Sequence, residues 1–351
     1  MFGMPINRYG DASVFEACKE LSTPSVNAND VLIKIKSSSV NPIDLMKREG
    51  YGKTIFEKQR KRLFPWILGS DVSGIVKSVG SKITKFKEGD EVWGSTSDPK
   101  CGTYCEYNVF NQNEIDFKPE NLSFNEAASL PYVALTTWSA LIRWAALRPQ
   151  DLESKKVFVQ AGSGGVGTFA IQLLKYWGAQ VATTCSQQNH NLVKELGAEI
   201  AIDYRQEEFQ NLLQDYDVVF DCVGDFGGSE SVNNCLSILK DETTSHYISL
   251  NHAFLRTIDE KGVLLGLPSA IKLRHQAKKD AKPINLHWSV YRPSNSGLRE
   301  LGRMVKAELI KPVIDSVYSL ENIKEAHEKV STSRAKGKVV IEVNTESLSS
   351  V

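Results

Sequence analysis

The chain has 351 residues, which is enough for two domains that each bury a hydrophobic core. Lys plus Arg and Asp plus Glu both total 42, so the formal net charge is zero and no overall field favours nucleic acid or a membrane surface. Hydrophobic residues make up 41% of the chain, but no apolar run approaches the ~20 residues that a bilayer span requires. These properties predict a soluble globular protein, without nucleic acid as a partner and without membrane insertion.

The N-terminus and the cysteines indicate a reducing compartment. Residues 1–16 lack a basic segment followed by an apolar block, which argues against a signal or transit peptide. The chain is too long to need disulfide staples, and its cysteines are scattered. They are Cys18, Cys101, Cys105, Cys185, Cys222 and Cys235. We therefore expect reduced thiols and a cytoplasmic location, or the mitochondrial matrix if a presequence has been removed.

The first third of the chain is predicted to be mostly β. Residues 31–36 alternate apolar and charged side chains, which is typical of a half-buried strand. Further strands are expected at residues 72–79 and 91–93, each bounded by the Gly, Ser or Asp residues that favour turns.

After Phe124 the pattern changes to alternating helices and strands. Helices are expected within residues 125–129 and 133–146. The strands of a parallel sheet are expected at residues 157–160, 180–184, 200–202, 218–221, 247–250 and 263–267. Residues 338–343 are predicted to form a strand that returns to the β domain. The chain is thus predicted to be α/β, with one domain at 1–125, completed by about 315–351, and a second at 126–314.

The strongest chemical signal is a glycine-rich turn between an apolar strand and a helix. Gly162, Gly164 and Gly167 satisfy G-x-G-x-x-G between the strand at 157–160 and the helical pattern at 168–177. The three glycines allow, in turn, a tight turn, the close approach of a pyrophosphate, and close packing of helix on strand. Free N–H groups at the start of the helix then bind the anion. A plain glycine-rich turn is the alternative, and the strand, loop, helix, strand context argues against it.

The second strand of this unit ends without the acid that selects NAD. Residues 181–190 contain no Asp or Glu to hold the ribose 2′-hydroxyl, so nothing there repels a 2′-phosphate. NADPH is therefore favoured over NADH as the cofactor. The stretch also lacks Arg and Lys, which leaves Ser186, His190 and Tyr204 as the available polar groups.

Three motifs resemble the quinone oxidoreductases of the medium-chain dehydrogenase/reductase family. Ser-Val-Asn-Pro-Ile-Asp at 39–44, Leu-Gly-Ser-Asp-Val-Ser-Gly at 68–74 and the glycine-rich turn at 161–167 follow the order and spacing of that family. The resemblance covers essentially the whole chain. It implies a GroES-like β domain, a Rossmann doubly wound parallel-sheet domain, an active site in the cleft between them, and a homodimer.

The same resemblance implies which residues bind NADPH. They are Gly162, Ser163, Gly164, Gly165, Val166, Gly167, Ser186, Tyr204, Cys222, Leu250, Tyr291, Arg334, Ala335 and Lys336. The last three depart from the wording of the family motif.

The zinc ligands of zinc-dependent relatives are not expected in this chain. At the matching places it has Asn41, Ser70 with Asp71, and no Cys between Leu130 and Ala140. Only Cys101 and Cys105 lie near the place of a structural zinc lobe, and two thiolates cannot complete a tetrahedral site. We therefore expect no metal.

These features predict an enzyme, an NADPH-dependent oxidoreductase that transfers hydride to a quinone or a similar conjugated carbonyl. Because the cofactor carries the chemistry, the protein mainly supplies position and water exclusion. A side-chain acid is not obligatory; Tyr51 is the first candidate donor, with Asn41 and Asp44 lining the cleft. Tyr51 could instead be an exposed loop aromatic, and Asn41 and Asp44 could be turn-forming groups.

Two other functions stay open. One is the reduction of an activated carbon–carbon double bond, as in alkenal or enoyl reductases. The other is an NADPH-binding sensor or interaction protein with little turnover. A nucleic-acid binder would need a clustered basic face, which the balanced charge does not require.

Overall fold

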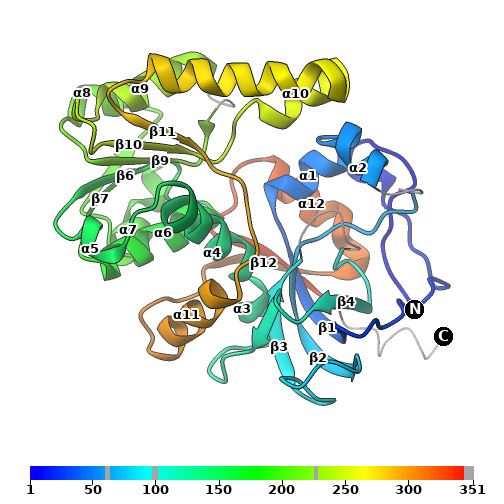
Figure 1. Cartoon of the computed structure of the whole chain (residues 1–351). Helices are drawn as coiled ribbons and strands as arrows, with labels where there is room; N and C mark the ends of the chain where they lie inside the picture. Colours follow the sequence, from blue (N-terminus) through cyan, green and yellow to red (C-terminus); the bar gives the residue numbers. More distant parts are fainter. Residues whose placement is uncertain (60–63, 97–101, 225–227, 344–351) are drawn as a thin grey trace. The chain divides into compact units, whose positions relative to one another are not determined.

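The structure is a computed structural model that describes residues 1–59, 64–96, 102–224 and 228–343. The chain forms two compact units, coloured by sequence in Figure 1. The first unit comprises Met1–Leu135 and Pro293–Val351, and the second comprises Thr136–Arg292. Residues 126–135 and 293–314, which the sequence analysis assigned to the nucleotide domain, are grouped with the first unit. Among the described residues, no helix has the length and apolar character needed to cross a bilayer.

The first unit is built around a mixed β-sheet. Its strands are β1 (Asp30–Val40), β2 (Asp71–Val79), β3 (Glu91–Ser95), β4 (Tyr107–Asn111), β5 (Ile115–Phe117), β12 (Ile314–Ser319) and β13 (Lys338–Glu342). Their order across the sheet is β12-β13-β1-β2-β3-β5, and β4 also pairs with β1. Strand β1 therefore pairs with β2 along one edge, and its other edge is shared by β4 and β13.

The alternating pattern of β1 explains how this sheet covers its core. Val31, Ile33 and Ile35 are fully buried, and the residues between them are partly exposed. The predicted strand at 31–36 is thus confirmed, and it extends at both ends. The predicted C-terminal strand is also confirmed, since β13 pairs antiparallel with β1 from Ser37↔Glu342 to Val40↔Val339. Strand β13, the last in the described part of the chain, therefore lies beside β1, the first.

Short helices surround this sheet. They are η1 (Ala12–Val14), α1 (Pro42–Arg48), α2 (Lys53–Gln59), α3 (Phe124–Ala128), α11 (Asn295–Lys306), η5 (Leu320–Asn322) and α12 (Ile323–Ser331). Helix α1 follows β1 directly because Pro42 stands at its first position, where a missing N–H costs nothing. The backbone N–H of Asn41 donates to Asp44 Oδ2 at 2.9 Å, which fixes the start of the helix.

The second unit contains a six-stranded sheet in which every pairing is parallel. Its strands are β6 (Lys156–Val159), β7 (Gln180–Cys185), β8 (Ile200–Asp203), β9 (Val218–Asp221), β10 (His246–Ser249) and β11 (Asn285–Trp288). The spatial order is β11-β10-β9-β6-β7-β8. The chain builds the sheet outward from β6 to β8 on one side and then from β9 to β11 on the other, so the strand order reverses between β6 and β9, as in the Rossmann fold. The predicted α/β class, with a GroES-like β unit and a Rossmann sheet, is confirmed.

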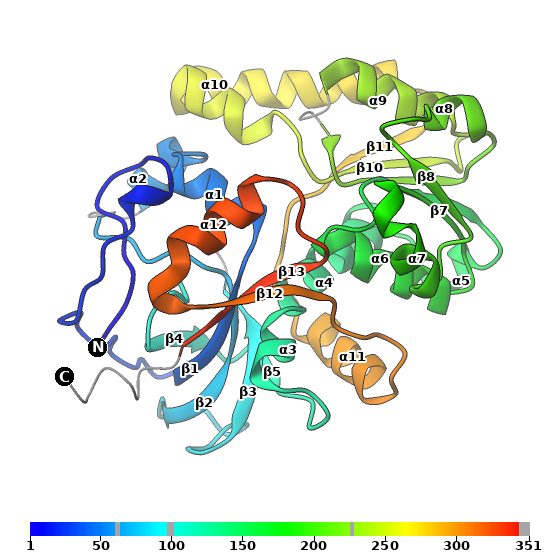
Figure 2. The ribbon, with the colours of Figure 1, turned by 180° about the vertical axis from the view of Figure 1, so that it is seen from behind.

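Helices cover both faces of the parallel sheet, as Figures 1 and 2 show. In chain order they are α4 (Pro131–Trp138), η2 (Ser139–Trp144, a π-helix), α5 (Pro149–Leu152), α6 (Gly165–Tyr176), η3 (Gln187–Asn189), α7 (His190–Glu195), α8 (Phe209–Leu212), α9 (Gly228–Ser237) and α10 (Phe254–Asp280). Helix α4 crosses the boundary between the two units. The buried centre of the sheet includes Phe158, Val219 and Tyr247.

One predicted strand is wrong. Residues 263–267 lie within α10, and the sixth strand of the sheet is β11 instead. A short apolar run does not distinguish a strand from a helix by periodicity, and here the run is not even buried, because Leu264 is 89% exposed. Helix α10 bends at Gly262, whose φ of 71° is a backbone conformation that glycine adopts at no steric cost.

Candidate nucleotide-binding site

The candidate site lies along the edge of the parallel sheet where the six strands end. In an open α/β sheet, ligands bind outside the carboxyl ends of the strands, at the point where the strand order reverses. Each of the six strands is followed there by a residue predicted to bind the cofactor. Across the sheet, from β11 to β8, these are Tyr291, Leu250, Cys222, the glycine turn, Ser186 and Tyr204. The turn itself follows β6, beside the reversal.

The turn after β6 is held in shape by β7. Ala161 has a left-handed φ of 59°, and its N–H donates to Thr184 Oγ1 at 3.1 Å. The N–H of Gly162 donates to the carbonyl of Thr184 at 2.9 Å. A Cβ on Gly162 would lie 2.0 Å from Thr183 Oγ1, so only glycine fits at this contact between turn and strand.

The other two glycines of the motif differ in their surroundings. A Cβ on Gly167 would lie 2.4 Å from the carbonyl oxygen of Ala161, inside the packed contact of helix and turn. A Cβ on Gly164 would meet only that same oxygen, at 3.5 Å, because this position faces open space. Gly167 is therefore required for packing, whereas Gly164 leaves room for a ligand.

Helix α6 begins with backbone N–H groups that no side chain caps. Gly164 is its N-cap residue and makes no side-chain hydrogen bond to the helix. The N–H groups of Gly165, Val166 and Gly167 have no acceptor within the helix, because the first turn of any α-helix lacks them. Together with the positive end of the helix dipole, they form a site suited to an anion such as a pyrophosphate.

Polar side chains gather after β7 and β8. Ser186 is buried and its hydroxyl accepts a hydrogen bond from Asn189 Nδ2 at 3.2 Å. Asn189 Oδ1 and His190 Nε2 are buried atoms without a hydrogen-bond partner in the described part of the chain. Buried polar atoms normally have partners, so a bound ligand group can fill this role.

Sequence reasoning missed one cation in this region. Arg205 lies beside Tyr204, with its guanidinium carbon 5.6 Å from the centre of the tyrosine ring. Tyr204 is 58% exposed, so its ring is available to a ligand. The signal was the arginine that follows Ile-Asp-Tyr at 202–204, outside the stretch searched for a 2′-phosphate partner.

At the other end of the edge, Asp221 organises the turn after β9. Its carboxylate accepts the N–H groups of Val223 and Gly224 and the hydroxyl of Tyr247, the last at 2.6 Å. Burial raises the pKa of Asp221, and these hydrogen bonds oppose the rise. Cys222 follows, and its carbonyl accepts a hydrogen bond from Asn251 Nδ2 at 2.7 Å. Burial raises the pKa of the Cys222 thiol, so the side chain is a neutral apolar surface.

The remaining predicted residues lie in the first unit. Arg334 and Lys336 are exposed, and Ala335 packs on the edge of the core. The N–H of Lys336 donates to Asp315 Oδ1 at 2.9 Å. Tyr51 follows α1 in a turn, where its N–H donates to the carbonyl of Met46 at 2.9 Å. The roles of these four residues toward a cofactor or substrate stay predictions.

Asn41 and Asp44 belong to a buried polar cluster, which we define as Ser39, Asn41, Asp44, Asp71, Tyr104 and Lys338. Asp44 Oδ2 accepts the N–H of Asn41, the capping role that the sequence analysis kept as an alternative. Tyr104 and Ser70 also donate to Asp44, at 3.4 and 3.2 Å. Burial raises the pKa of Asp44 and that of Tyr104.

Lys338 brings a positive charge into the buried polar cluster. Its ammonium donates to Asn41 Oδ1, to the carbonyl of Val40 at 3.3 Å and to Asp71 Oδ2 at 3.4 Å. Burial lowers the pKa of Lys338, and the nearby carboxylates Asp71 and Asp44 oppose the fall. Only 4% of the lysine is exposed, so all three donors are used inside the protein.

The residues at the zinc-ligand positions do not fit a zinc ion. Asp71 Oδ2 accepts hydrogen bonds from Ser39 at 2.6 Å and Asn41 at 2.9 Å, and Oδ1 accepts the N–H of Tyr132 at 2.6 Å. With the Lys338 ammonium beside it, this carboxylate is already saturated. In the described ranges, no group of three or more His, Cys, Asp or Glu side chains is arranged to hold a metal. Cys101 lies outside the described residues, and Cys105 is fully buried.

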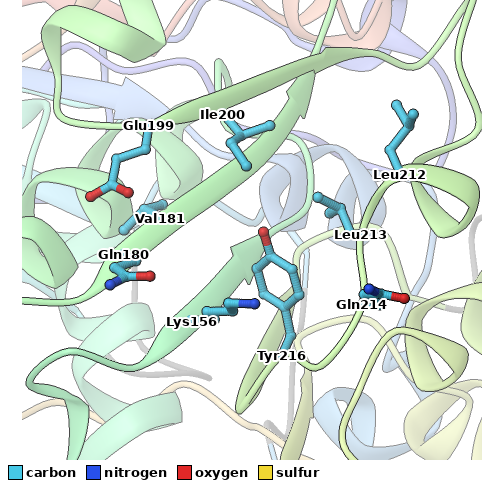
Figure 3. Close-up of a pocket in the computed structure, with 9 residues that line it drawn as sticks. All are labelled: Lys156, Gln180, Val181, Glu199, Ile200, Leu212, Leu213, Gln214 and Tyr216. Atoms are coloured by element: carbon cyan, nitrogen blue, oxygen red, sulfur yellow. The ribbon is translucent and has the colours of Figure 1, made fainter.

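A pocket in the second unit lies at the opposite edge of the parallel sheet. Figure 3 shows it lined by Lys156 and Gln180, which begin β6 and β7, by Ile200 at the start of β8, and by Tyr216, just before β9. These are the amino ends of the strands. The pocket is therefore distinct from the candidate nucleotide-binding edge.

Two family models match the chain. The alcohol dehydrogenase GroES-like domain matches residues 27–133, and the zinc-binding dehydrogenase model matches residues 196–341. The second model carries zinc in its description, although the residues at the ligand positions of this chain do not fit the ion.

Related proteins match over nearly the whole chain. NAD(P)H oxidoreductase RTN4IP1, mitochondrial, is 36% identical in Danio rerio and 37% identical in Homo sapiens; each match covers 96% of this chain and 90% or 88% of the relative. 2-methylene-furan-3-one reductase of Solanum lycopersicum is 32% identical over 95% of this chain and 76% of its own.

Solved structures share the fold. The quinone oxidoreductase from Coxiella burnetii is 30% identical, with a TM-score of 0.81 and coverage of 98% of this chain and 99% of its own. The Escherichia coli quinone oxidoreductase complexed with NADPH has a TM-score of 0.78 at 21% identity, covering 98% and 100% of the two chains.

The fold and the relatives together define a medium-chain dehydrogenase/reductase, and the enzyme is an NAD(P)H-dependent oxidoreductase. Within that class, the chain belongs to the quinone oxidoreductase family that includes RTN4IP1. The resemblance seen in the motifs at 39–44, 68–74 and 161–167 is thereby confirmed. From the sequence alone, the strings at 48–52, 162–172, 185–187 and 201–204 predict a likeness to reticulon-4-interacting protein.

Proposed function

We propose that this enzyme uses NADPH to reduce a quinone or a similar conjugated carbonyl, without zinc. The observation that carries the proposal is the row of cofactor-binding candidates along one sheet edge, with the glycine turn beside the strand reversal. When bound, NADPH supplies a hydride, which is two electrons and one proton. The reduced acceptor takes its second proton from water or from a side chain, for which Tyr51 is the first candidate.

The pyrophosphate would bind to the backbone of the glycine turn. The N–H groups of Gly165, Val166 and Gly167 point out of the first turn of α6, and Gly164 leaves the space in front of them open. Ser163 completes this loop. The nicotinamide would then lie toward Cys222, Leu250 and Tyr291, the positions that follow β9, β10 and β11.

The adenosine end favours NADPH over NADH. Ser186, Tyr204 and Arg205 offer a hydroxyl, an aromatic face and a guanidinium, and an arginine binds phosphate oxygens bidentately. Asn189 and His190 supply buried polar atoms that need partners. Residues 181–190 contain no acid that would repel the 2′-phosphate. Asp203 is buried, and its carboxylate accepts the N–H of Arg205 within its own turn, at 3.1 Å.

The acceptor and the biological setting are inferred from relatives. The names of the Coxiella burnetii and Escherichia coli proteins specify quinone oxidoreductases, and the latter was solved with NADPH. We propose that residues 1–125 with 315–351 supply the substrate residues and 126–314 the cofactor residues, apart from Arg334, Ala335 and Lys336. We further propose a homodimer and a cytoplasmic or mitochondrial matrix location, in keeping with the mitochondrial names of the animal relatives.

A second candidate is the reduction of an activated carbon–carbon double bond. It is favoured by the similarity to the tomato 2-methylene-furan-3-one reductase, whose name specifies an enone substrate. The electron balance is the same, since hydride reaches the β-carbon and a proton reaches the α-carbon.

Both candidates are tested by following NADPH and NADH oxidation with quinones of varied tail length and with enals. We expect turnover with NADPH and a quinone, and slower turnover with NADH. Faster turnover with enals would favour the second candidate. Tight NADPH binding without turnover on any acceptor would contradict both and indicate a sensor or interaction protein.

Arg205→Ala tests the cofactor preference separately. We expect the Kd for NADPH to rise about tenfold, while the Kd for NADH stays unchanged, because a charge-assisted hydrogen bond to phosphate is lost. Arg8→Ala is the matched control, since Arg8 lies in the other unit in an exposed pair with Glu16. Equal effects of Arg205→Ala on both nucleotides would contradict the assigned role.

A further inference from the structure

Helix α10 exposes an unusual number of apolar side chains. Of the thirteen large hydrophobic residues that are exposed in the described part of the chain, five lie between residues 264 and 273. Leu264 is 89%, Leu265 71%, Ile271 55% and Leu267 41% exposed, and we call these four residues the α10 patch. A cluster of this kind on a folded protein commonly marks an interaction surface.

The fold of α10 explains why the patch faces outward. The helix bends at Gly262, and its two segments pack against each other. A Cβ on Gly266 would lie 2.6 Å from Ile258 Cα, so the segments touch at this glycine. Gly266 and Ala270, one turn apart, thus define the inner face; Leu264, Leu265 and Ile271 point away from it, and Leu267 lies at its border. In Figures 1 and 2 the second segment starts beyond the edge of the parallel sheet.

Basic side chains continue the same outer face toward the end of the helix. Lys272, Lys278 and Lys279 are exposed, and Lys282 follows just after the helix. Residues 263–282 contain five basic residues and one acidic residue, a net charge of +4. The chain as a whole is neutral, so this is a local concentration of charge. None of the four lysines forms an ion pair with a carboxylate in the ranges that the structure covers.

We propose that the second segment of α10 docks the enzyme onto a membrane surface that carries anionic lipids. Leucine and isoleucine side chains would enter the boundary between headgroups and acyl chains, and the lysines would contact lipid phosphates. A helix with exposed leucines and a basic flank has the composition of interfacial helices. Each lysine near an anionic surface increases binding about fivefold.

The composition favours lipid over a protein partner. The cores of protein–protein interfaces are depleted in lysine and enriched in tyrosine, tryptophan, methionine and arginine. The α10 patch has none of these four residue types, and lysines border it. The proposal concerns the surface alone and holds whichever acceptor the enzyme reduces.

The test is co-sedimentation of the full chain with phosphatidylcholine vesicles, with and without phosphatidylglycerol. We expect binding only to the anionic vesicles, weakened by salt. The paired changes Leu264→Ser with Leu265→Ser, and Lys278→Glu with Lys279→Glu, should each lower the partition coefficient at least about tenfold. Matched controls are Leu212→Ser with Leu309→Ser, and Lys82→Glu with Lys87→Glu, which alter exposed residues elsewhere and should change it less than about twofold.

Several results would overturn the proposal. These are absence of binding to anionic vesicles, equal binding to neutral vesicles, and helix variants that bind as the wild type does. If the leucine variant forms a smaller particle than the wild type in the absence of vesicles, the α10 patch contacts a second copy of the chain. If the leucine variant has a lower Tm than the wild type, the patch contributes to packing within the chain. NADPH affinity, measured on every variant, should not change, so failure here leaves the proposed function untouched.

Discussion

The buried polar cluster of the first unit and the glycine turn of the second both gather polar groups, but they leave them in opposite states. In the cluster, Asp71, Lys338 and Asn41 satisfy one another inside the protein, with at most 4% of any of them exposed. At the glycine turn, the groups are backbone amides that α6 leaves without acceptors, next to the open position Gly164.

The difference teaches how to separate polar structure from polar function in this molecule. A closed network has no capacity left for a ligand, and removing one member leaves its partners unpaired in a region of low dielectric. The free N–H groups at the start of α6 cost little folding free energy because water can solvate them. They gain a protein-bound acceptor only when the ligand binds. Substitutions in the cluster should therefore change stability, and those at Gly164 should change affinity.

The largest expected effect comes from Lys338→Met. The change removes the ammonium and leaves the Asp71 carboxylate buried without a counter-ion, so the free energy of unfolding should fall by about 3–5 kcal/mol. Urea denaturation measures this fall. The double variant Lys338→Met with Asp71→Asn should recover part of the loss because the buried charge is gone. Equal stability of Lys338→Met and the wild type would show that Lys338 and Asp71 do not form a buried ion pair in solution.

A smaller effect distinguishes two glycines of one motif. Gly167→Ala places a Cβ 2.4 Å from the Ala161 carbonyl oxygen, so overpacking should lower the free energy of unfolding by about 1–3 kcal/mol. Gly164→Ala should cost about 1 kcal/mol or less, as a change of N-cap residue. It should nevertheless raise the Kd for NADPH about tenfold or more, because the methyl group occupies the approach of the pyrophosphate. Thermal unfolding measures the stability of the two variants, and a fluorescence titration measures their Kd for NADPH. Gly167→Ala should have the larger effect on stability, and Gly164→Ala the larger effect on the Kd.

The smallest effect at neutral pH concerns a buried neutral histidine, His252. Its ring stacks on Trp288 at 5.0 Å, and burial lowers its pKa from 6.5 to about 4. Since the folded pKa is depressed, the unfolded chain binds the proton first, and stability that is present above pH 6.5 is lost as the pH falls toward 4. The loss is up to about 1.4 kcal/mol per pH unit.

His252→Phe should remove this pH dependence and keep a ring on Trp288. At pH 7 the variant should be about 1 kcal/mol less stable, because the hydrogen bond to the carbonyl of Ser289 is lost. The two curves of unfolding free energy against pH should approach each other below pH 6.5 and cross before pH 4. Parallel curves would show that His252 is not the titrating group.

Local patterns predicted much of the fold, including five of the six parallel strands, the glycine turn and the returning strand β13. Each of these has a signal within a few residues, such as the spacing of Gly162, Gly164 and Gly167, and so does β1, with its alternation at Val31, Ile33 and Ile35. The run at 263–267 lacks such a signal, since its apolar residues suit either a strand or a helix. Strand β11 was missed because it is short and polar at its start.

The buried polar cluster could not be predicted from sequence. Asn41, Asp71 and Lys338 come from three separate regions of the chain, and only the pairing of β13 with β1 brings the lysine to the other two. Asp44 was recognised as a possible turn residue because its partner, Asn41, is three positions away. Arg205 was overlooked for a related reason, since it follows the third strand and not the second.

The pairing of β13 with β1 also bears on how the chain is made. As a ribosome releases the polypeptide from its N-terminus, β1 emerges early, but the partner for its residues Ser37–Val40 arrives only with the last segment. The inserted stretch Thr136–Arg292 is continuous and is synthesised in full before that happens. The second unit can thus fold while β1 of the first unit still exposes an unpaired strand edge. During that interval the nascent protein most needs protection from aggregation.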